Sequence, residues 1–328
     1  MVSSGMKANG LMLQDEVHQK RELIAVGLNP AWQKTLSFPE FIPGEVNRAS
    51  SVSLFPAGKG INFARAASIW GAKTTVCQFL GGHTGEFIKE GLREERIRHV
   101  SVELNSPVRT CSTCICMKTG KVTELIEPSA PVPSRYVRSL KKKILEKIPS
   151  SAGIALCGTY PEGVGAGFYA DIASAGKEKG KIVMLDGFKG IGETLEKGVS
   201  VLKVNKSEFS SLTGKRDIFE AAKAFFRRYD VRFAAITDGP SKAYLFDMYG
   251  VCEYKIPACG KVLNPIGAGD TVSAVLLTEL VRGTSPAEAF RKALGAGTAS
   301  CFNIKSADFS IARAGKFAQK IRILKKPY

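Results

Sequence analysis

"NPIGAGDTVSAVLL", residues 264–277, joins a glycine-rich turn to a run of apolar residues spaced three and four apart. That spacing indicates a helix with one buried face, beginning close to Asp270. Glycine lets a ligand approach the main chain closely, and the unpaired N–H groups at a helix start favour an anion. The segment 267–269 is therefore a candidate anion-binding site.

A lone carboxylate stands at the same junction. Asp270 would repel a bound anion unless it takes part in the chemistry, for example by removing a proton from a hydroxyl group that attacks a phosphate. Asp270 would equally suit the start of an ordinary helix, because aspartate is a preferred capping residue. This stretch by itself leaves both interpretations open.

The composition is that of a soluble globular protein. The chain has 328 residues, of which 44% are hydrophobic and 23% charged, and this length favours one large domain or a domain with an appendage. The apolar runs are too short to span a membrane, and the N-terminal segment lacks the apolar core of a secretion signal. We expect residues 1–22 to be a partly disordered extension, residues 23–328 to form the folded domain, and the protein to be cytoplasmic.

The eight cysteines lie mostly in apolar surroundings, as buried thiols of a reducing compartment do. The cluster "CSTCIC", residues 111–116, raises the possibility of zinc. A structural zinc site needs four ligands, and no second Cys/His pair follows nearby. We therefore expect this segment to be a strand.

The formal net charge of +17 would suit a nucleic-acid partner. No helix-turn-helix, zinc-finger or aromatic-basic strand pattern accompanies the charge, so we expect no nucleic-acid partner. The basic clusters fit solvated helix faces, and a smaller share of the charge would steer anionic substrates toward the protein.

Strand-like and helical runs alternate along most of the chain. This pattern predicts an α/β fold with a mostly parallel sheet covered by helices on both faces, in which ligands bind beyond the carboxyl ends of the strands. Residues 34–56 and 109–128 break the alternation and look like strands with turns at Pro43–Gly44 and Thr119–Gly120. We expect them to form a small separate sheet that acts as a lid.

Two further motifs suit a phosphate-handling site. "PAGKGINFARA", residues 56–66, brings Gly58 and Lys59 to a helix start, which predicts anion binding or simply a tight strand–helix turn. "KVNKSEF", residues 203–209, places Asn205 and Glu208 one helical turn apart. These two oxygen-bearing side chains could serve Mg²⁺ through water, although an Asn N-cap followed by Glu is also common at helix starts.

Five landmarks in this order carry a resemblance: "LNP" (28–30), "AGKGINFARA" (57–66), "GTYPEG" (158–163), "NKSE" (205–208) and "GAGD" (267–270). From about Leu23 to the C-terminal helix, the chain resembles the ribokinase/PfkB family of sugar kinases. "GLNPAWQKTL" (27–36), "GKGIN" and "NPIGAGD" resemble the branch of 1-phosphofructokinases and tagatose-6-phosphate kinases. The resemblance implies a doubly wound, ribokinase-like α/β domain with a small β-sheet lid, through which many members form homodimers.

The resemblance also implies roles for particular residues. Asp270 would be the general base, and the main-chain N–H groups of Gly267, Ala268 and Gly269 would hold the transferring phosphoryl group. Asn205 and Glu208 would organise Mg²⁺ and ATP, with Thr237, Gly239 and Asn303 contacting the nucleotide. The acceptor sugar would meet Gln33, Gly58, Asn62 and Thr159, and its own phosphate would lie between Lys59 and Arg109.

One departure from the family pattern concerns the substrate. The family usually has an acidic residue at the position of Gln33, where a carboxylate accepts hydrogen bonds from sugar hydroxyls, whereas an amide both donates and accepts. We expect an ATP-dependent kinase that phosphorylates a hydroxymethyl group of a phosphorylated ketohexose. The alternatives are a kinase of an unphosphorylated sugar or nucleoside, and a non-catalytic sugar- or nucleotide-sensing protein.

Overall fold

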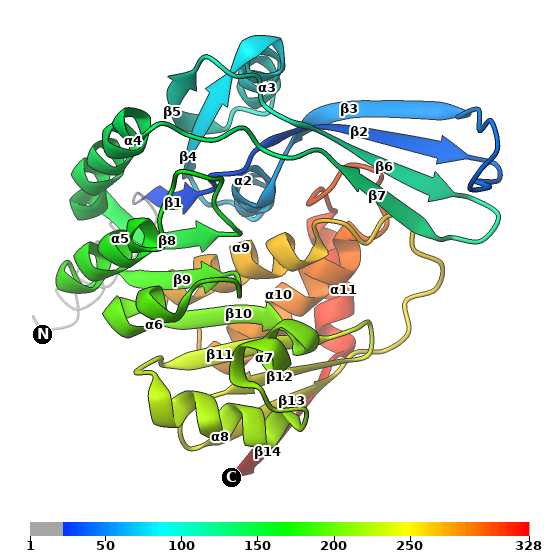
Figure 1. Cartoon of the computed structure of the whole chain (residues 1–328). Coiled ribbons are helices and arrows are strands. Elements are labelled where there is room, and N and C mark those ends of the chain that lie inside the picture. Colours follow the sequence, from blue (N-terminus) through cyan, green and yellow to red (C-terminus); the bar gives the residue numbers. More distant parts are fainter. Residues whose placement is uncertain (1–21, 328) are drawn as a thin grey trace, which may run out of the picture.

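The computed structural model describes residues 22–327, and its main feature is a large twisted sheet (Figure 1). Among these residues, ten strands pair in the order β14-β13-β12-β11-β10-β9-β8-β1-β4-β5. The strands from β11 to β5 in this order are parallel, and β12, β13 and β14 add an antiparallel edge. Their bounds are β1 (Glu22–Val26), β4 (Thr74–Gly81), β5 (Arg98–Leu104), β8 (Ser151–Cys157), β9 (Ile182–Asp186), β10 (Val201–Asn205), β11 (Phe233–Asp238), β12 (Lys242–Phe246), β13 (Gly250–Lys255) and β14 (Arg322–Pro327).

Helices cover both faces of this sheet, which confirms the α/β prediction. One face carries α2 (Lys59–Ile69), α9 (Ala268–Val281), α10 (Pro286–Ser300) and α11 (Ile311–Lys320). The other carries α4 (Ser134–Lys147), α5 (Gly167–Glu178), α6 (Gly192–Gly198), α7 (Lys206–Thr213) and α8 (Ile218–Arg228). Helix α3 (Gly82–Glu94) packs against β4 and α2, and a short 3-10 turn, η1 (Ile148–Ser150), precedes β8.

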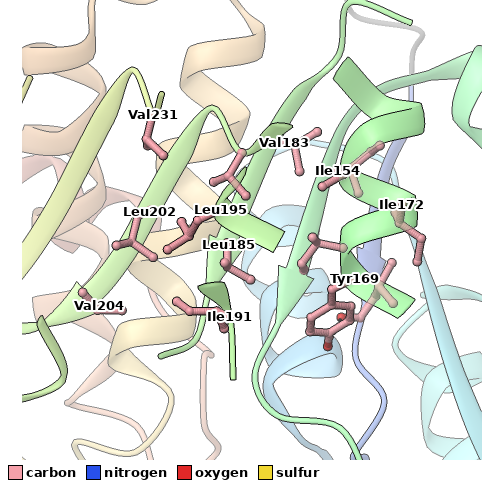
Figure 2. Packing of buried hydrophobic residues seen from close by; sticks show 14 of the residues in the cluster. Ile154, Tyr169, Ile172, Val183, Leu185, Ile191, Leu195, Leu202, Val204 and Val231 are labelled. Atoms are coloured by element: carbon pink, nitrogen blue, oxygen red, sulfur yellow. Dashed lines mark hydrogen bonds between the residues drawn. The ribbon is translucent and has the colours of Figure 1, made fainter. Parts of the chain in front are cut away.

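The core is built from the buried faces of these layers. Figure 2 shows Tyr169 and Ile172 of α5 packed toward Ile154 and Val183 of the sheet, with Leu202 farther along it. These side chains are at most 1% exposed. Because parallel strands are covered on both faces, they form near-continuous apolar runs, such as 23–26 and 183–185.

A second sheet of four strands stands apart from the main one, as the interruptions in the alternation predicted. Its order is β3-β2-β6-β7, with β2 (Ala31–Phe38), β3 (Ser51–Ala57), β6 (Thr110–Cys116) and β7 (Val122–Ile126). In Figure 1 this small sheet extends to the upper right, away from α4–α8. The cysteine-rich segment is strand β6, as expected, and within residues 22–327 no group of three or more His, Cys, Asp or Glu side chains is placed to hold a metal ion.

The order of the strands creates a crevice beside β1. From β1 the chain builds outward through β4 to β5, and then returns to the other side of β1 to form β8–β11. Ligands of doubly wound sheets bind at such a reversal, beyond the carboxyl ends of the strands. Glu22 belongs to β1, and the rest of the predicted extension, residues 1–21, lies outside the described residues. In the described part of the chain, each helix is too short or too polar to cross a membrane.

Candidate active site

A cavity of about 600 Å³ lies at this crevice, between the carboxyl edge of the main sheet and the small sheet. A second cavity of about 750 Å³ adjoins it and shares part of its wall. The first is lined by these predicted site residues: Gln33, Gly58, Lys59, Asn62, Arg109, Thr159, Asn205, Glu208, Thr237, Gly267, Gly269 and Asp270. Gly239 and Ala268 line the second, so the fold gathers nearly all of the predicted site residues around one pair of cavities.

Gly267 is the N-cap of α9 and adopts a left-handed conformation, with φ 84° and ψ −3°. A Cβ at this position would come within 2.8 Å of the Ser306 Cβ and 2.9 Å of the Ala307 nitrogen. Both the backbone angles and the space therefore require glycine. The resulting helix start presents its first turn to the cavity.

Asp270 is the third residue of α9 and is only 7% exposed. Its Oδ2 accepts a hydrogen bond of 2.8 Å from Nδ2 of Asn62, and no side chain caps this helix. The capping interpretation is therefore wrong, because the carboxylate is directed at the cavity wall formed by α2. Burial raises the pKa of Asp270, while the positive charge of Lys59 opposes that rise.

Lys59 lies between two carboxylates instead of standing free opposite Arg109. Its Nζ is 2.7 Å from Asp186 Oδ1 and 3.7 Å from Asp270 Oδ1. Burial alone would lower the pKa of Lys59, but the two carboxylates raise it, so the ammonium stays charged. A contact between Lys59 and the substrate's own phosphate, which the resemblance implies, stays a prediction, and the two carboxylates already share the charge of Lys59.

Asp186 and Lys203 are site residues that the sequence reasoning missed. Asp186 accepts a hydrogen bond of 2.6 Å from Ser273 Oγ, and its Oδ2 lies 3.9 Å from Lys203 Nζ. Although burial opposes ionisation, Lys203 and Lys59 hold the pKa of Asp186 below its usual range. The sequence carried a signal, because Asp186 and Lys203 are charged residues in the mostly apolar runs 182–186 and 201–205. The structure leaves them 3% and 4% exposed, and such residues are seldom buried without a partner.

Arg109 enters the cavity from the start of β6. Its contacts are long: Nη2 lies 3.4 Å from the Asn29 carbonyl oxygen and Nη1 lies 3.5 Å from that of Glu127. Its Nε is buried without a hydrogen-bond partner, and no carboxylate of residues 22–327 forms an ion pair with it. A buried donor without a partner is unfavourable, so this guanidinium is suited to receive an anionic ligand.

Gln33 and Thr159 both line the first cavity, Gln33 from the small sheet and Thr159 from the loop after β8. Gln33 is buried on β2, and its Nε2 donates to the Thr113 hydroxyl at 2.9 Å. Thr159 follows β8, where its carbonyl oxygen and hydroxyl both accept from Asn29 Nδ2 at 3.1 Å. Gly58 has φ 105°, and a Cβ there would come within 2.8 Å of the Asn29 carbonyl oxygen, so these loops are closely packed.

Asn205 and Glu208 form a capping box at the start of α7. Asn205 Oδ1 accepts from the Glu208 N–H at 2.9 Å, and Glu208 Oε2 accepts from the Asn205 N–H at 2.8 Å. Both side chains still line the cavity, and Glu208 contributes to the raised pKa of Lys59. Because the second carboxylate oxygen of Glu208 is uncommitted, the pair fits a hydrated Mg²⁺ that keeps most of its water.

The second cavity has the size and apolar lining of a nucleotide-base pocket. Ile256, Val262, Val272 and Leu294 line it, together with Thr237 and Gly239. Asn303 does not reach either cavity, because its side chain closes a turn by donating to the Asp308 carbonyl oxygen at 3.0 Å.

Among the main-chain donors at the start of α9, the Ala268 N–H already has a partner, the Pro265 carbonyl oxygen at 3.2 Å. Gly267 and Gly269 are therefore the freer donors of the helix start.

A buried carboxylate beside a glycine-rich helix start, on this doubly wound sheet, defines a phosphotransferase site of the ribokinase-like type. The sequence pattern of the pfkB family carbohydrate kinases matches residues 21–311, and the chain belongs to that family. It is therefore an enzyme that phosphorylates a carbohydrate, as expected.

Curated relatives and solved structures cover nearly the whole chain. It is 25% identical to a tagatose-6-phosphate kinase of Staphylococcus epidermidis over 92% of this chain and 99% of the relative. It is 27% identical to a 1-phosphofructokinase of Bacillus subtilis over 86% of this chain and 93% of the relative. The phosphofructokinase-2 of Escherichia coli, solved in complex with substrates and products, has the same fold, with a TM-score of 0.84 at 23% identity over 91% of this chain and 98% of that one.

Proposed function

We propose that the protein transfers the γ-phosphoryl group of ATP to a hydroxymethyl group of a phosphorylated ketohexose of the fructose or tagatose type. The observation that carries this proposal is the pairing, in one cavity, of a buried base with a guanidinium that lacks a carboxylate partner. Arginine binds phosphate through two parallel hydrogen bonds, which an unphosphorylated sugar cannot offer. The relatives named for tagatose 6-phosphate and fructose phosphate support the same substrate class.

Asp270 would remove the proton from the attacking hydroxyl. Its burial raises its pKa and makes it a stronger base, while Lys59 at 3.7 Å keeps it ionised. Lys59 and the N–H groups of Gly267 and Gly269 would stabilise the negative charge on the transferring phosphoryl group. Phosphoryl transfer depends on this kind of positioning and charge stabilisation more than on covalent chemistry.

ATP would lie with its base in the second cavity and its phosphates directed along the start of α9 toward Asp270. Thr237 and Gly269 line both cavities, so a molecule in the second cavity can extend past them toward Asp270 in the first. Asn205 and Glu208 would hold Mg²⁺ through water. When bound, Mg²⁺ would neutralise phosphate charge.

A screen of ATP consumption tests the proposal. The acceptors are fructose 1-phosphate, fructose 6-phosphate, tagatose 6-phosphate, the corresponding free sugars, and nucleosides. We expect turnover with at least one ketohexose phosphate and a far higher KM for its free sugar. Turnover confined to free sugars or nucleosides would contradict the proposal, and tight sugar binding without turnover would indicate a sensor.

We also infer a homodimer formed through the small sheet. Val52, Leu54 and Leu125 are 54%, 52% and 57% exposed. They pair across the strands with Leu36, Lys34 and Ser112. Successive side chains of a strand point to opposite faces. Because Gln33 and Cys111, the neighbours of Lys34 and Ser112, line the cavity, this apolar face points away from it. Exposed apolar patches of this kind commonly mark interaction sites. Sedimentation velocity should show a dimer that Leu54→Glu dissociates, whereas a monomeric wild-type protein would contradict the inference.

A further inference from the structure

The face of the small sheet above the cavity carries a second carboxylate. Directly paired residues of neighbouring strands share a face, and the register pairs Thr35 of β2 with Thr113 of β6, and Thr113 with Glu124 of β7. The next row toward the main sheet pairs Gln33 with Cys111, and Cys111 with Ile126. Glu124 therefore lies one row from Gln33 and on the same face, and it lines the cavity.

Glu124 has no hydrogen-bond or ion-pair partner among the described residues that would account for a carboxylate at the cavity. Among residues 22–327 its carboxylate accepts no hydrogen bond and forms no ion pair, whereas Glu127, just after β7, accepts a hydrogen bond from the Thr110 N–H. Burial raises the pKa of Glu124, and the charge of Asp270 adds to this rise, which places the carboxylate within electrostatic reach of the reaction centre. On the same face, the buried hydroxyl of Thr35 also lacks a hydrogen-bond partner.

We propose that Glu124 accepts hydrogen bonds from the hydroxyl groups of the acceptor sugar, the role that the family gives to an acidic residue at the position of Gln33. This inference rests on the proposed function. Gln33 is an amide, and its nitrogen is already bonded to Thr113. Glu124 supplies a carboxylate from the other side of β6. An ionised carboxylate accepts several hydroxyl hydrogen bonds at once.

The spacing of charges on this face suits a sugar phosphate. Glu124 is paired with Thr113 of β6. Thr113 lies four residues after Arg109, which corresponds to about 13 Å along an extended chain. No ion pair joins Arg109 to Glu124 in the described structure, so the space between the two side chains is left for a ligand. It accommodates a molecule with a phosphate at one end and hydroxyl groups at the other, lying beneath the sheet beside Asp270.

Steady-state kinetics of Glu124→Gln, with whichever sugar phosphate the wild type phosphorylates, test the inference. Loss of a hydrogen bond to a charged group should raise the KM for the sugar about ten- to hundredfold, with the KM for ATP unchanged within twofold. Because Glu124 makes no hydrogen bond or ion pair in the described structure, the variant should fold normally, as its melting temperature will show. Gln33→Asp in the Glu124→Gln background should recover part of the lost affinity, since it returns a carboxylate to the same face.

The matched control is Glu40→Gln, which removes a carboxylate of the small-sheet region that pairs with Lys118 outside the cavity, and should leave both KM values unchanged. Deoxy analogues of the sugar phosphate locate the contact: the loss of affinity caused by removing one hydroxyl should shrink in Glu124→Gln. A normal sugar KM in Glu124→Gln would overturn the role of Glu124 and leave the proposed function standing. A wild type that phosphorylates no sugar phosphate would overturn both.

Discussion

Lys59 and Asp270 lie 3.7 Å apart, Nζ to Oδ1, at the carboxyl edge of the main sheet. The same ammonium is bonded to Asp186 at 2.7 Å, so Asp270, the proposed base, shares its counterion with a second buried carboxylate. This arrangement couples the protonation of Asp270 to the charge of Lys59 and makes the pH dependence of turnover a direct test of the site.

Lys59→Met should move the acid limb of the pH profile of kcat/KM to higher pH. Burial raises the pKa of Asp270 and Lys59 lowers it, so loss of the cation raises it further. Because a base works only when ionised, activity falls as the pH falls through that pKa. Lys118→Met, which removes a surface cation paired with Glu40, is the control and should leave the profile in place. An acid limb at the same pH in Lys59→Met would show that another group limits the rate.

Asp270→Asn should bind ATP normally but lose about a hundred- to ten-thousandfold in kcat, the range that general bases contribute. The asparagine oxygen can still accept the hydrogen bond from Asn62, so we expect the fold to persist. Calorimetric titration with a non-hydrolysable ATP analogue and single-turnover kinetics measure the two effects separately. Rates within a few-fold of wild type would show that the carboxylate is not the base.

Arg109→Ala should raise the KM for the sugar phosphate about a hundredfold, since charge-assisted hydrogen bonds to phosphate contribute up to a few kcal/mol. The KM for ATP should change little, because Arg109 lies on the small sheet, away from the second cavity. Arg138→Ala on α4 removes an exposed cation whose side chain donates to Ser134, and serves as the control. If Arg109→Ala has a normal KM for its best acceptor, then that acceptor carries no phosphate of its own before the reaction.

Gly267→Ala should destabilise the protein by more than the roughly 1–2 kcal/mol that a left-handed conformation costs an L-residue, because its Cβ would also clash with Ser306 and Ala307. Gly283→Ala separates the two contributions. Gly283 has φ 85°, but a Cβ there meets nothing within 4 Å. Urea unfolding of both variants measures the difference, and equal losses would mean that the clash at Gly267 relaxes.

The sequence by itself determined the local features of this protein. The spacing of apolar residues after Asp270 predicted α9, the alternation of strands and helices predicted a mostly parallel sheet covered by helices, and the two interruptions predicted the separate small sheet. These features depend on neighbours only a few residues away, because helical and strand periodicity are properties of consecutive residues. The glycine at 267 is likewise required by the backbone angles of its own turn.

Only the tertiary structure decided which charges meet. Asp186 lies 127 residues from Lys59, and Asp270 lies 208 residues from Asn62. Asn303, which the family resemblance placed near the nucleotide, closes a turn by donating to the Asp308 carbonyl oxygen. A side chain's electrostatic partners depend on the order in which strands assemble and on which strand ends meet at the crevice, and no periodicity in the sequence encodes that order. For the same reason the carboxylate of Glu124 could be recognised only once β7 had been paired with β6 above the cavity.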